Sequence, residues 1–173
     1  MSAITPHAGS PTDFDFLVGE WVVHHLRLRT RHVGSRDWDE FVGTSRCWTL
    51  LDGVANVDEM DCSSRGFSGM SMRTLDLVSR RWSIYWISSG DGRLLPPVQG
   101  CFGAVDAGSD DDRGAGRGET VGEFVGHDVD GDLPVMARFI WTVRTDAPRW
   151  EQAFSADGGT TWETNWVMKF RRV

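Results

Sequence analysis

The chain has 173 residues, which is enough for one domain with a buried core. Apolar residues make up 40% of it and charged residues 25%, so the composition is that of a soluble globular protein and excludes a disordered one. The formal net charge of −7 at pH 7 argues against nucleic acid and anionic membranes as partners.

Three further features of the sequence concern cellular location and cofactors. The N-terminal stretch MSAITPHAGSPTD has neither a basic start nor an apolar run, so we expect no export signal. No segment approaches the roughly 20 consecutive apolar residues that cross a bilayer. The three cysteines, Cys47, Cys62 and Cys101, form no C-x-x-C pair, which favours reduced thiols over a zinc site. We therefore expect a cytoplasmic protein with no metal and no cofactor.

The predicted elements follow one another at short intervals, separated by Gly, Asp, Ser and Pro. Residues 1–12 are expected to be a flexible N-terminus, and PTDFDFLVGE is expected to contain a helical turn with Thr12 or Asp13 as its cap. Runs with period two then predict strands. These runs cover residues 21–33, 39–51, 54–62, 68–77, 81–88, 97–105, 119–129, 135–144, 149–155 and 160–172.

This order of elements predicts an all-β fold. Sequential strands without intervening helices indicate an antiparallel meander, and closing it into an up-and-down β-barrel of about ten strands removes the exposed edges. Residues 13–173 would then form a single barrel domain that can hold one small ligand. DAGSDDDRGAGRGE, residues 106–119, contains only small or charged side chains and is expected to be a mobile loop.

The stretch FSADGGTTWE, residues 154–163, resembles the Asp-box of sialidases, S-x-D-x-G-x-T-W. A sialidase propeller needs several blades of roughly 40–50 residues, and this chain shows one box. The motif also has a structural meaning, because Asp157-Gly158-Gly159 supplies the positive φ angles of a tight hairpin and Ser155 and Asp157 bind its N–H groups. We therefore interpret the box as a hairpin and not as evidence of a glycosidase.

Two resemblances concern the whole fold. Gly19-Glu20-Trp21 resembles the G-x-W of lipocalins, in which the Trp closes the barrel floor and meets an Arg near the end of the last strand, the place of Arg171 or Arg172 here. The chain also resembles a bacterial family of calycin-like proteins of uncharacterised function. The matching stretches are FDFLVGEW, NVDE, GMSMRTLD, WSIYW, ARFIW and RWEQAFSADGGTTWETNWVMKF, between residues 13 and 172. This resemblance implies a lipocalin-like barrel and no particular activity.

Side chains alternate between the two faces of a strand, so each predicted strand offers two phases. For the first strand we favour the phase that turns Trp21, Val23, His25 and Arg27 inward, while the opposite phase stays open. In the last strand the aromatic face with Trp166 and Phe170 is the natural interior. That phase leaves Asn165 outside unless a bulge shifts the register.

The aromatic content predicts a cavity. Nine Trp and nine Phe stand beside one Tyr, and indoles from several strands would form an apolar wall with a few polar groups. The wall would comprise Trp21, Trp86, Trp141, Trp150 and Trp166, and the polar groups would be His25, Asn56, Glu59, Arg73, Tyr85, Arg138 and Gln152. The alternative is that the Trp residues fill the barrel and leave no space.

The run NVDEMD, residues 56–61, places three carboxylates on a strand that should be half-buried. Alternation puts Asn56 and Asp58 on one face and Glu59 and Asp61 on the other. A carboxylate that points inward must pair with a cation or titrate at a raised pKa. Arg73 and Arg138 are the expected partners.

Two functions are compatible with these residues. The first is binding of a small hydrophobic or aromatic molecule by Trp21, Asn56, Trp86, Arg138, Trp141, Trp150, Gln152 and Trp166. The alternative is a cofactor-free isomerase, cyclase or hydrolase in which His25 or Glu59 acts as general base and Tyr85 or Arg73 stabilises an oxyanion. The expected partner is such a small molecule in both cases, and homodimerisation stays open.

Overall fold

The computed structural model describes residues 4–105 and 119–173. In these residues it contains the 3₁₀ turns η1 (Asp15–Leu17), η2 (Leu51–Gly53) and η3 (Ser63–Arg65). Its strands are β1 (Ile4–Pro6), β2 (Gly19–Leu28), β3 (Trp38–Leu50), β4 (Ala55–Cys62), β5 (Phe67–Asp76), β6 (Arg81–Ser88), β7 (Val98–Val105), β8 (Thr120–Asp130), β9 (Leu133–Thr142), β10 (Arg149–Ser155) and β11 (Glu163–Arg172).

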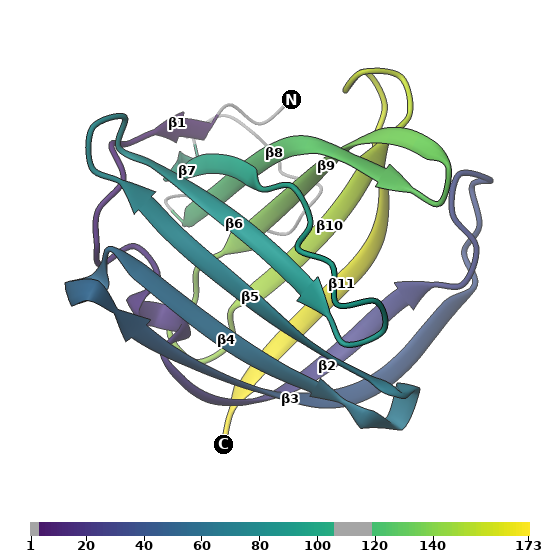
Figure 1. Ribbon diagram of the computed structural model, residues 1–173, viewed down its shortest axis with the longest axis horizontal. Helices are drawn as coiled ribbons and strands as arrows, with labels where there is room; N and C mark the ends of the chain where they lie inside the picture. Colours follow the sequence, from purple (N-terminus) through teal and green to yellow (C-terminus); the bar gives the residue numbers. More distant parts are fainter. Residues whose placement is uncertain (1–3, 106–118) are drawn as a thin grey trace.

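The strands form one closed antiparallel sheet. Their order is β1-β7-β6-β5-β4-β3-β2-β11-β10-β9-β8, and β7 also pairs with β8. Strands β2 to β11 therefore make a ten-stranded up-and-down barrel, with the short β1 added beside β7 (Figure 1). The all-β barrel expected from the sequence is confirmed, and each of the ten predicted strands overlaps an observed one.

Period-two alternation explains why these segments form strands with one buried face. In β3, Phe41, Gly43 and Cys47 are buried, whereas the intervening Val42 and Thr44 are exposed. In β2, Trp21, Val23 and His25 are fully buried, so the phase that we favoured for this strand is confirmed.

Part of the N-terminal segment that was expected to be flexible forms the strand β1. Ile4–Pro6 pairs with Gly103–Val105 of β7, and the His7 N–H donates to the Phe102 carbonyl oxygen at 2.9 Å. The three residues of β1 are too few to show a period in the sequence. The predicted mobile loop 106–119 lies outside the described residues except for Glu119, whose carboxylate pairs with Arg144.

The predicted helical turn is the 3₁₀ turn η1, but neither Thr12 nor Asp13 caps it in the expected way. Phe14 precedes the turn and makes no capping hydrogen bond with its side chain. The Asp13 carboxylate instead accepts hydrogen bonds from the Ser10 N–H at 2.8 Å and from Trp82 Nε1 at 3.0 Å. Asp13 therefore ties the N-terminal segment to β6.

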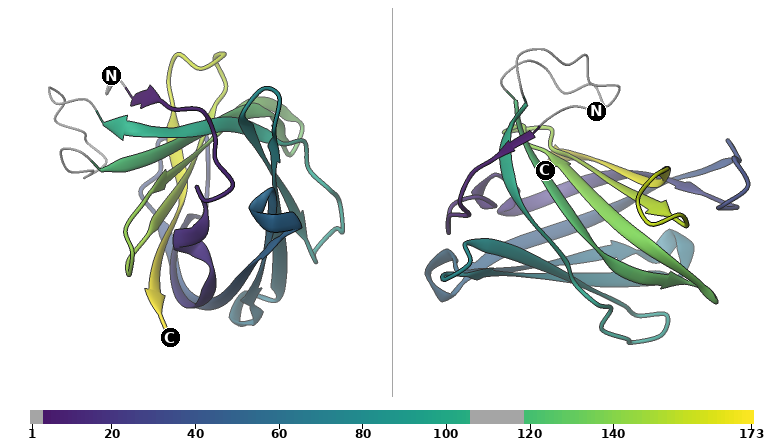
Figure 2. Two further views of the ribbon diagram at one scale, coloured as in Figure 1. Left: turned by 90° about the vertical axis from the view of Figure 1, so that its left-hand side faces the viewer. Right: turned by 90° about the horizontal axis from the view of Figure 1, so that it is seen from above.

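One end of the barrel is closed by Trp21 and Arg172. The Arg172 Cζ atom lies 3.9 Å from the centroid of the Trp21 ring, and its guanidinium donates to the Val18 oxygen at 2.6 Å and the Phe16 oxygen at 3.1 Å. Trp21 Nε1 donates to the Leu17 oxygen at 2.7 Å. The segment with η1 thereby lies across this end of the barrel (Figure 2). Arg172, and not the exposed Arg171, is the partner of the G-x-W motif.

The Asp-box forms the predicted hairpin between β10 and β11. Ser155 Oγ accepts from the Gly159 N–H at 2.8 Å, and the Asp157 carboxylate accepts from the Thr161 N–H and hydroxyl at 2.9 and 2.6 Å. These hydrogen bonds lower the pKa of Asp157. Gly158 and Gly159 have φ angles of 71° and 92°, which favour glycine. The motif is a turn that binds its own backbone.

A bulge in β11 brings Asn165 into the interior. Gln152 pairs with Trp166 and Ala153 pairs with Thr164, so Asn165 is the additional residue. Asn165 is buried, and its Oδ1 accepts from Gln152 Nε2 at 2.8 Å. The phase expected from the sequence left Asn165 outside unless a bulge shifted the register, and the structure has this bulge.

The barrel wall is interrupted between β6 and β8. β6 pairs with β7 only through Trp82–Ile84, and β7 pairs with β8 only as far as Val125. Residues 89–97 cross the remaining space between the far ends of β6 and β8 (Figure 1). This connection is held by a bridge between Ile87 and Leu94 and by the Leu95 N–H, which donates to the Trp86 oxygen at 3.0 Å.

Candidate ligand-binding cavity

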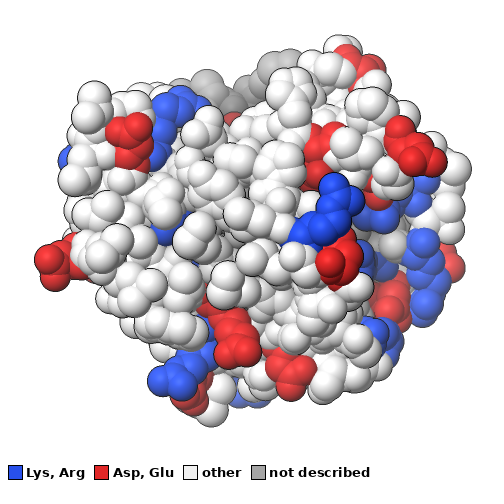
Figure 3. Space-filling view, viewed as in Figure 1, with Lys and Arg blue, Asp and Glu red and all other residues white. Residues whose placement is uncertain are grey.

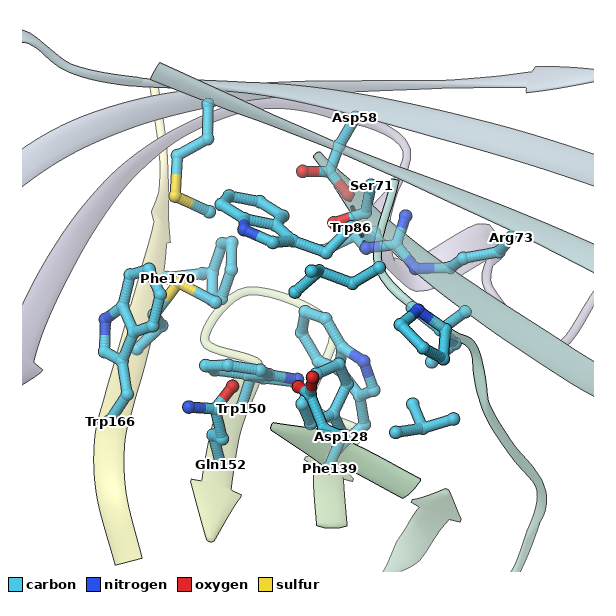
Figure 4. Close-up of a pocket in the computed structure, with 18 residues that line it drawn as sticks. Asp58, Ser71, Arg73, Trp86, Asp128, Phe139, Trp150, Gln152, Trp166 and Phe170 are labelled. Atoms are coloured by element: carbon cyan, nitrogen blue, oxygen red, sulfur yellow. Dashed lines mark hydrogen bonds and ion pairs between the residues drawn. The ribbon is translucent and has the colours of Figure 1, made fainter. Parts of the chain in front are cut away.

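A partly enclosed cavity lies inside the barrel, next to this interruption in the wall. Its lining is mostly aromatic and aliphatic, with a few polar groups from several strands (Figure 4). The aromatic residues are Trp86, Phe139, Trp141, Trp150, Trp166 and Phe170; the polar ones are Asp58, Ser71, Arg73, Asp128 and Gln152; the others are Leu17, Met60, Ile84, Leu95, Pro96, Val98 and Met168. In Figure 3 the middle of this face is largely uncharged, while acidic and basic side chains lie on its right-hand side and around its rim.

The aromatic rings of the cavity support one another edge to face. Trp166 meets Trp86 at 6.2 Å and Trp150 at 5.7 Å between ring centroids, with interplanar angles of 89° and 84°. Phe139 meets Trp150 at 4.9 Å. Such contacts are the favoured geometry of aromatic pairs, so the wall is held in place by its own packing.

The cavity is small. Its volume is about 50 Å³, which is the space that on the order of four water molecules need. Most of the aromatic side chains therefore fill the barrel. Trp21 and Trp82, for example, have no exposed surface. A guest larger than this volume requires the connection 89–97 or the half-buried Trp86 to move. Both earlier alternatives hold in part: the barrel is largely filled, and one hollow is left.

Gly69 explains the position of Trp86. The indole lies against the backbone of β5, where a Cβ atom on Gly69 would come within 2.0 Å of Trp86 Cη2. In Figure 4 the Trp86 ring extends between the side with Asp58 and Ser71 and the side with Phe170. Trp86 therefore limits the cavity on the side next to the interrupted wall.

Arg73 and Asp58 form a buried ion pair on the wall of the cavity. Their side chains are 3% and 4% exposed, and Arg73 Nη2 donates to Asp58 Oδ1 while Nη1 donates to Asn56 Oδ1 at 2.9 Å. The Cζ atom also lies 5.2 Å from the Phe14 ring and 5.8 Å from the Trp141 ring. The strand register explains the cluster, because Asn56 is paired with Arg73 and Asp58 with Ser71 across β4 and β5.

Two N–H groups of this cluster have no protein partner among the described residues. They are Arg73 Nε and Trp141 Nε1, both buried, and both residues line the cavity. A buried donor without an acceptor costs about 1–3 kcal/mol. Both groups are only donors, so they match an acceptor on a guest.

His25 is buried next to the cavity but does not line it. Trp166 Nε1 donates to His25 Nδ1 at 3.2 Å, so the neutral ring carries its proton on Nε2, which lies 3.7 Å from Cys62 Sγ. Burial, with smaller effects of His24 and Arg27, lowers the pKa of His25 from 6.5 to about 4. Its one lone pair accepts the Trp166 N–H in this structure, and His25 does not line the cavity.

Three other expected polar residues point away from the cavity. Glu59 is exposed on the outer face of β4, and Tyr85 and Arg138 lie on the outer faces of β6 and β9. The Arg138 Cζ atom lies 4.4 Å from the Trp162 ring, where it covers the hairpin. Alternation is the reason, since their neighbours Asp58, Trp86 and Phe139 line the interior.

The remaining expected contacts divide between the wall and its support. Trp86, Trp141, Trp150, Gln152 and Trp166 line the cavity, and Arg73 does so as well. Trp21 lies beneath the cavity in the floor, and Asn56 is buried behind Arg73 as its hydrogen-bond acceptor.

Ser71 and Asp128 are polar residues of the cavity that our sequence interpretation did not name, and Asp128 is the ionisable one. Asp128 lines the cavity, as do Leu95 and Pro96 of the connection, and burial raises the pKa of its carboxyl above the ordinary value. Its parity with the inward Phe124 on β8 was the available signal. The neighbouring His127 and Val129 are exposed, and beyond Val125 strand β8 is not paired with β7. The inward direction of Asp128 was therefore not recognised from the sequence.

The fold and the site define a closed β-barrel with a small internal cavity. The chain matches no protein-family model, and no curated protein is significantly similar to it. Within residues 4–105 and 119–173, no helix is long and apolar enough to cross a membrane, and no three His, Cys, Asp or Glu side chains are grouped to hold a metal ion. What the protein does must therefore be inferred from the geometry of the cavity.

Proposed function

We propose that the protein binds a small, compact aromatic or apolar molecule inside the barrel. The supporting observation is the cavity itself, which is lined by six aromatic rings and a few polar groups. A mostly apolar hollow with a small number of polar groups is typical of small-molecule sites. The closed barrel is what a member of the calycin-like family requires, so membership in that bacterial family, suggested by the sequence motifs, is part of the proposal.

The proposal is tested by filling the cavity. Titration of the full chain with single-ring aromatic compounds should give a saturable change in Trp fluorescence, because Trp86, Trp150 and Trp166 surround the guest. The variant Ser71→Leu adds a side chain to the lining and should lose this change. The matched control Thr74→Leu lies on the outer face of the same strand and should keep it.

Two results would contradict binding in this cavity. One is a flat fluorescence signal with every compound. The other is equal affinity of the wild type and of Ser71→Leu when both are folded by circular dichroism.

A second candidate function is supported by Asp128. A carboxyl with a raised pKa at the edge of an apolar cavity, together with Arg73 on its wall, is an arrangement that suits general acid–base catalysis. The cofactor-free isomerase, cyclase or hydrolase would then use Asp128 to move the proton. Replacing Asp128 with Asn should abolish turnover of a bound compound and leave its affinity within a few-fold; turnover that persists in the variant would remove this role.

A further inference from the structure

Arg73 and Trp141 hold two unsatisfied donors on the cavity wall. Arg73 Nε and Trp141 Nε1 have no acceptor within residues 4–105 and 119–173, and the two residues are only 3% and 2% exposed. The guanidinium Cζ lies 5.8 Å from the centroid of the Trp141 ring, so the two residues are neighbours on the cavity wall. Asp58 and Asn56 each accept a hydrogen bond from one of the other two nitrogens of Arg73, and Nε is its one nitrogen with no acceptor among the described residues.

The charges around these donors disfavour an anion. The charge of Arg73 is already balanced by Asp58 in a buried pair. Asp128 is the second carboxyl in the lining, and His25, behind Trp166, is held neutral. A carboxylate on the guest would be a further acidic group facing a single guanidinium, and its desolvation would not be repaid by a new ion pair.

The aromatic wall favours a flat guest. Trp150 and Trp166 meet edge to face at 5.7 Å, and Phe139 meets Trp150 in the same way at 4.9 Å. A planar ring continues this pattern, and a carbonyl conjugated to the ring lies in its plane. The volume of about 50 Å³ is smaller than the roughly 150 Å³ of a cavity that binds benzene, so even a single-ring guest requires Trp86 or the connection 89–97 to move, and a compact guest requires the smallest movement.

From these three observations we propose that the ligand is a compact aromatic compound with an uncharged carbonyl oxygen, which accepts hydrogen bonds from Arg73 Nε and Trp141 Nε1. This inference rests on the proposed binding function and specifies the chemical class of the ligand. It also assigns a role to two donors that are otherwise buried at a cost.

The test compares three probes of similar shape. Acetophenone carries a carbonyl, α-methylstyrene replaces its oxygen with a methylene group, and benzoate carries a carboxylate. The wild-type chain should bind acetophenone roughly tenfold more tightly than α-methylstyrene, because the hydrocarbon leaves both donors unpaired. Benzoate should bind more weakly than acetophenone. Affinities are measured by Trp fluorescence and by calorimetry.

Two variants test whether the Trp141 N–H causes the preference for a guest with a carbonyl oxygen. Trp141→Phe keeps a ring but removes the donor, so the ratio of the affinities for acetophenone and α-methylstyrene should fall severalfold. Trp150→Phe is the matched control, because the Trp150 indole lines the same cavity but is not among the buried groups that lack a partner, and its ratio should stay near the wild-type value. If Trp141→Phe does not fold, the ratio in the wild type decides the question.

The outcomes separate this inference from the proposed function. Equal affinities of the wild type for acetophenone and α-methylstyrene would overturn the carbonyl and leave cavity binding in place, as would a ratio that Trp141→Phe does not change. Benzoate as the tightest probe would overturn the uncharged acceptor. Failure of all three probes to bind would overturn the inference together with the proposed function.

Discussion

The guanidinium of Arg172 lies between the ring of Trp21 and the carbonyl oxygens of Val18 and Phe16. These contacts join the last strand, the first long strand and the segment that carries η1. Gly19 makes the approach possible, because a Cβ atom there would come within 2.4 Å of Arg172 Nη1, and its φ of 122° is one that glycine adopts readily. Arg172, packed on Trp21, thereby closes one end of the barrel.

We predict that Arg172→Ala destabilises the protein by about 3 kcal/mol, because it removes a cation–π contact and leaves two carbonyl oxygens without their charged donor. The neighbouring variant Arg171→Ala is the control, since Arg171 is exposed and should change stability by no more than about 0.5 kcal/mol. Urea unfolding followed by Trp fluorescence measures both. Similar effects of the two variants would mean that the floor does not depend on this contact.

His25 is the second residue with a measurable consequence, through pH. Its pKa is lowered to about 4 in the folded state, so the unfolded chain takes up the proton first as the pH falls. The stability due to neutral His25 is therefore complete above about pH 6.5 and is lost between pH 6.5 and 4. We predict a loss of about 2 kcal/mol from this residue between pH 7.5 and 5.

The measurement for His25 is the free energy of unfolding at both pH values for the wild type and for His25→Gln. Gln keeps an acceptor for Trp166 but does not titrate, so the variant should show a smaller loss of stability at pH 5. The exposed His24→Gln should follow the wild type. Identical pH dependence in the wild type and in His25→Gln would show that His25 does not carry this effect.

At the scale of single elements, the hairpin between β10 and β11 combines local sequence with a long-range result. Its turn is fixed by side chains within a few residues, since Ser155 and Asp157 bind the N–H groups of Gly159 and Thr161. The bulge that follows is set by pairing with β2 as well as β10, because Met168 opposite His25 and Arg172 opposite Trp21 hold the rest of β11 in register. The turn was predicted from the sequence. The bulge was not predicted, and the sequence showed only that Asn165 would face outward without one.

We predict that Asp157→Ala lowers the melting temperature and leaves probe binding within a few-fold. The carboxylate holds the turn, and Asp157 is not part of the cavity lining. Because hydrogen bonds lower the pKa of Asp157, its stabilising effect is present above the ordinary pKa of an aspartate and falls as acid protonates it. The control is Asp132→Ala, an exposed residue in the turn between β8 and β9. An unchanged melting temperature in Asp157→Ala would contradict the structural role of the box.

At the scale of the whole molecule, the barrel has a continuous side and an interrupted side. β2 pairs with β11 from Trp21 to Arg27 without a break. On the other side β6 and β7 share three residue pairs, and the connection 89–97 completes the wall. The carbonyl oxygen of Pro97 lies where a Cβ atom on Gly126 would be only 2.5 Å away, so the connection packs closely on the end of β8.

We predict that this interrupted side opens most easily. Amide hydrogens in residues 89–97 and in the final residues of β8 should exchange at least roughly tenfold faster than those in β2 and β11, because fewer strand hydrogen bonds protect them. A bound aromatic probe should slow exchange in residues 89–97. Hydrogen exchange with mass spectrometry measures both effects. Uniform protection around the barrel would place the access route elsewhere.

The site was predictable in part because its residues follow from strand parity. Trp86, Trp141, Trp150, Gln152 and Trp166 line the cavity as expected. Glu59, Tyr85 and Arg138 were candidates because of their chemistry, and alternation directs them outward. His25 points inward, as the phase of β2 requires, but it lies behind Trp166 and does not line the cavity. The direction of a side chain follows from local pattern, whereas its neighbours depend on strands far apart in the chain.

The sequence by itself determined the ten strands of the barrel, their antiparallel order and the hairpin at the Asp-box, because each depends on local periodicity or turn chemistry. The resemblance to lipocalins implied the Trp–Arg contact of the floor and left Arg171 and Arg172 open. Only the tertiary structure decided the size of the hollow, the break between β6 and β8, and the meeting of Arg73, Trp141 and Asp128 around one cavity. These features arise from the volumes of side chains that pack across a closed barrel and from the register at which distant strands meet, and period-two patterns carry neither quantity.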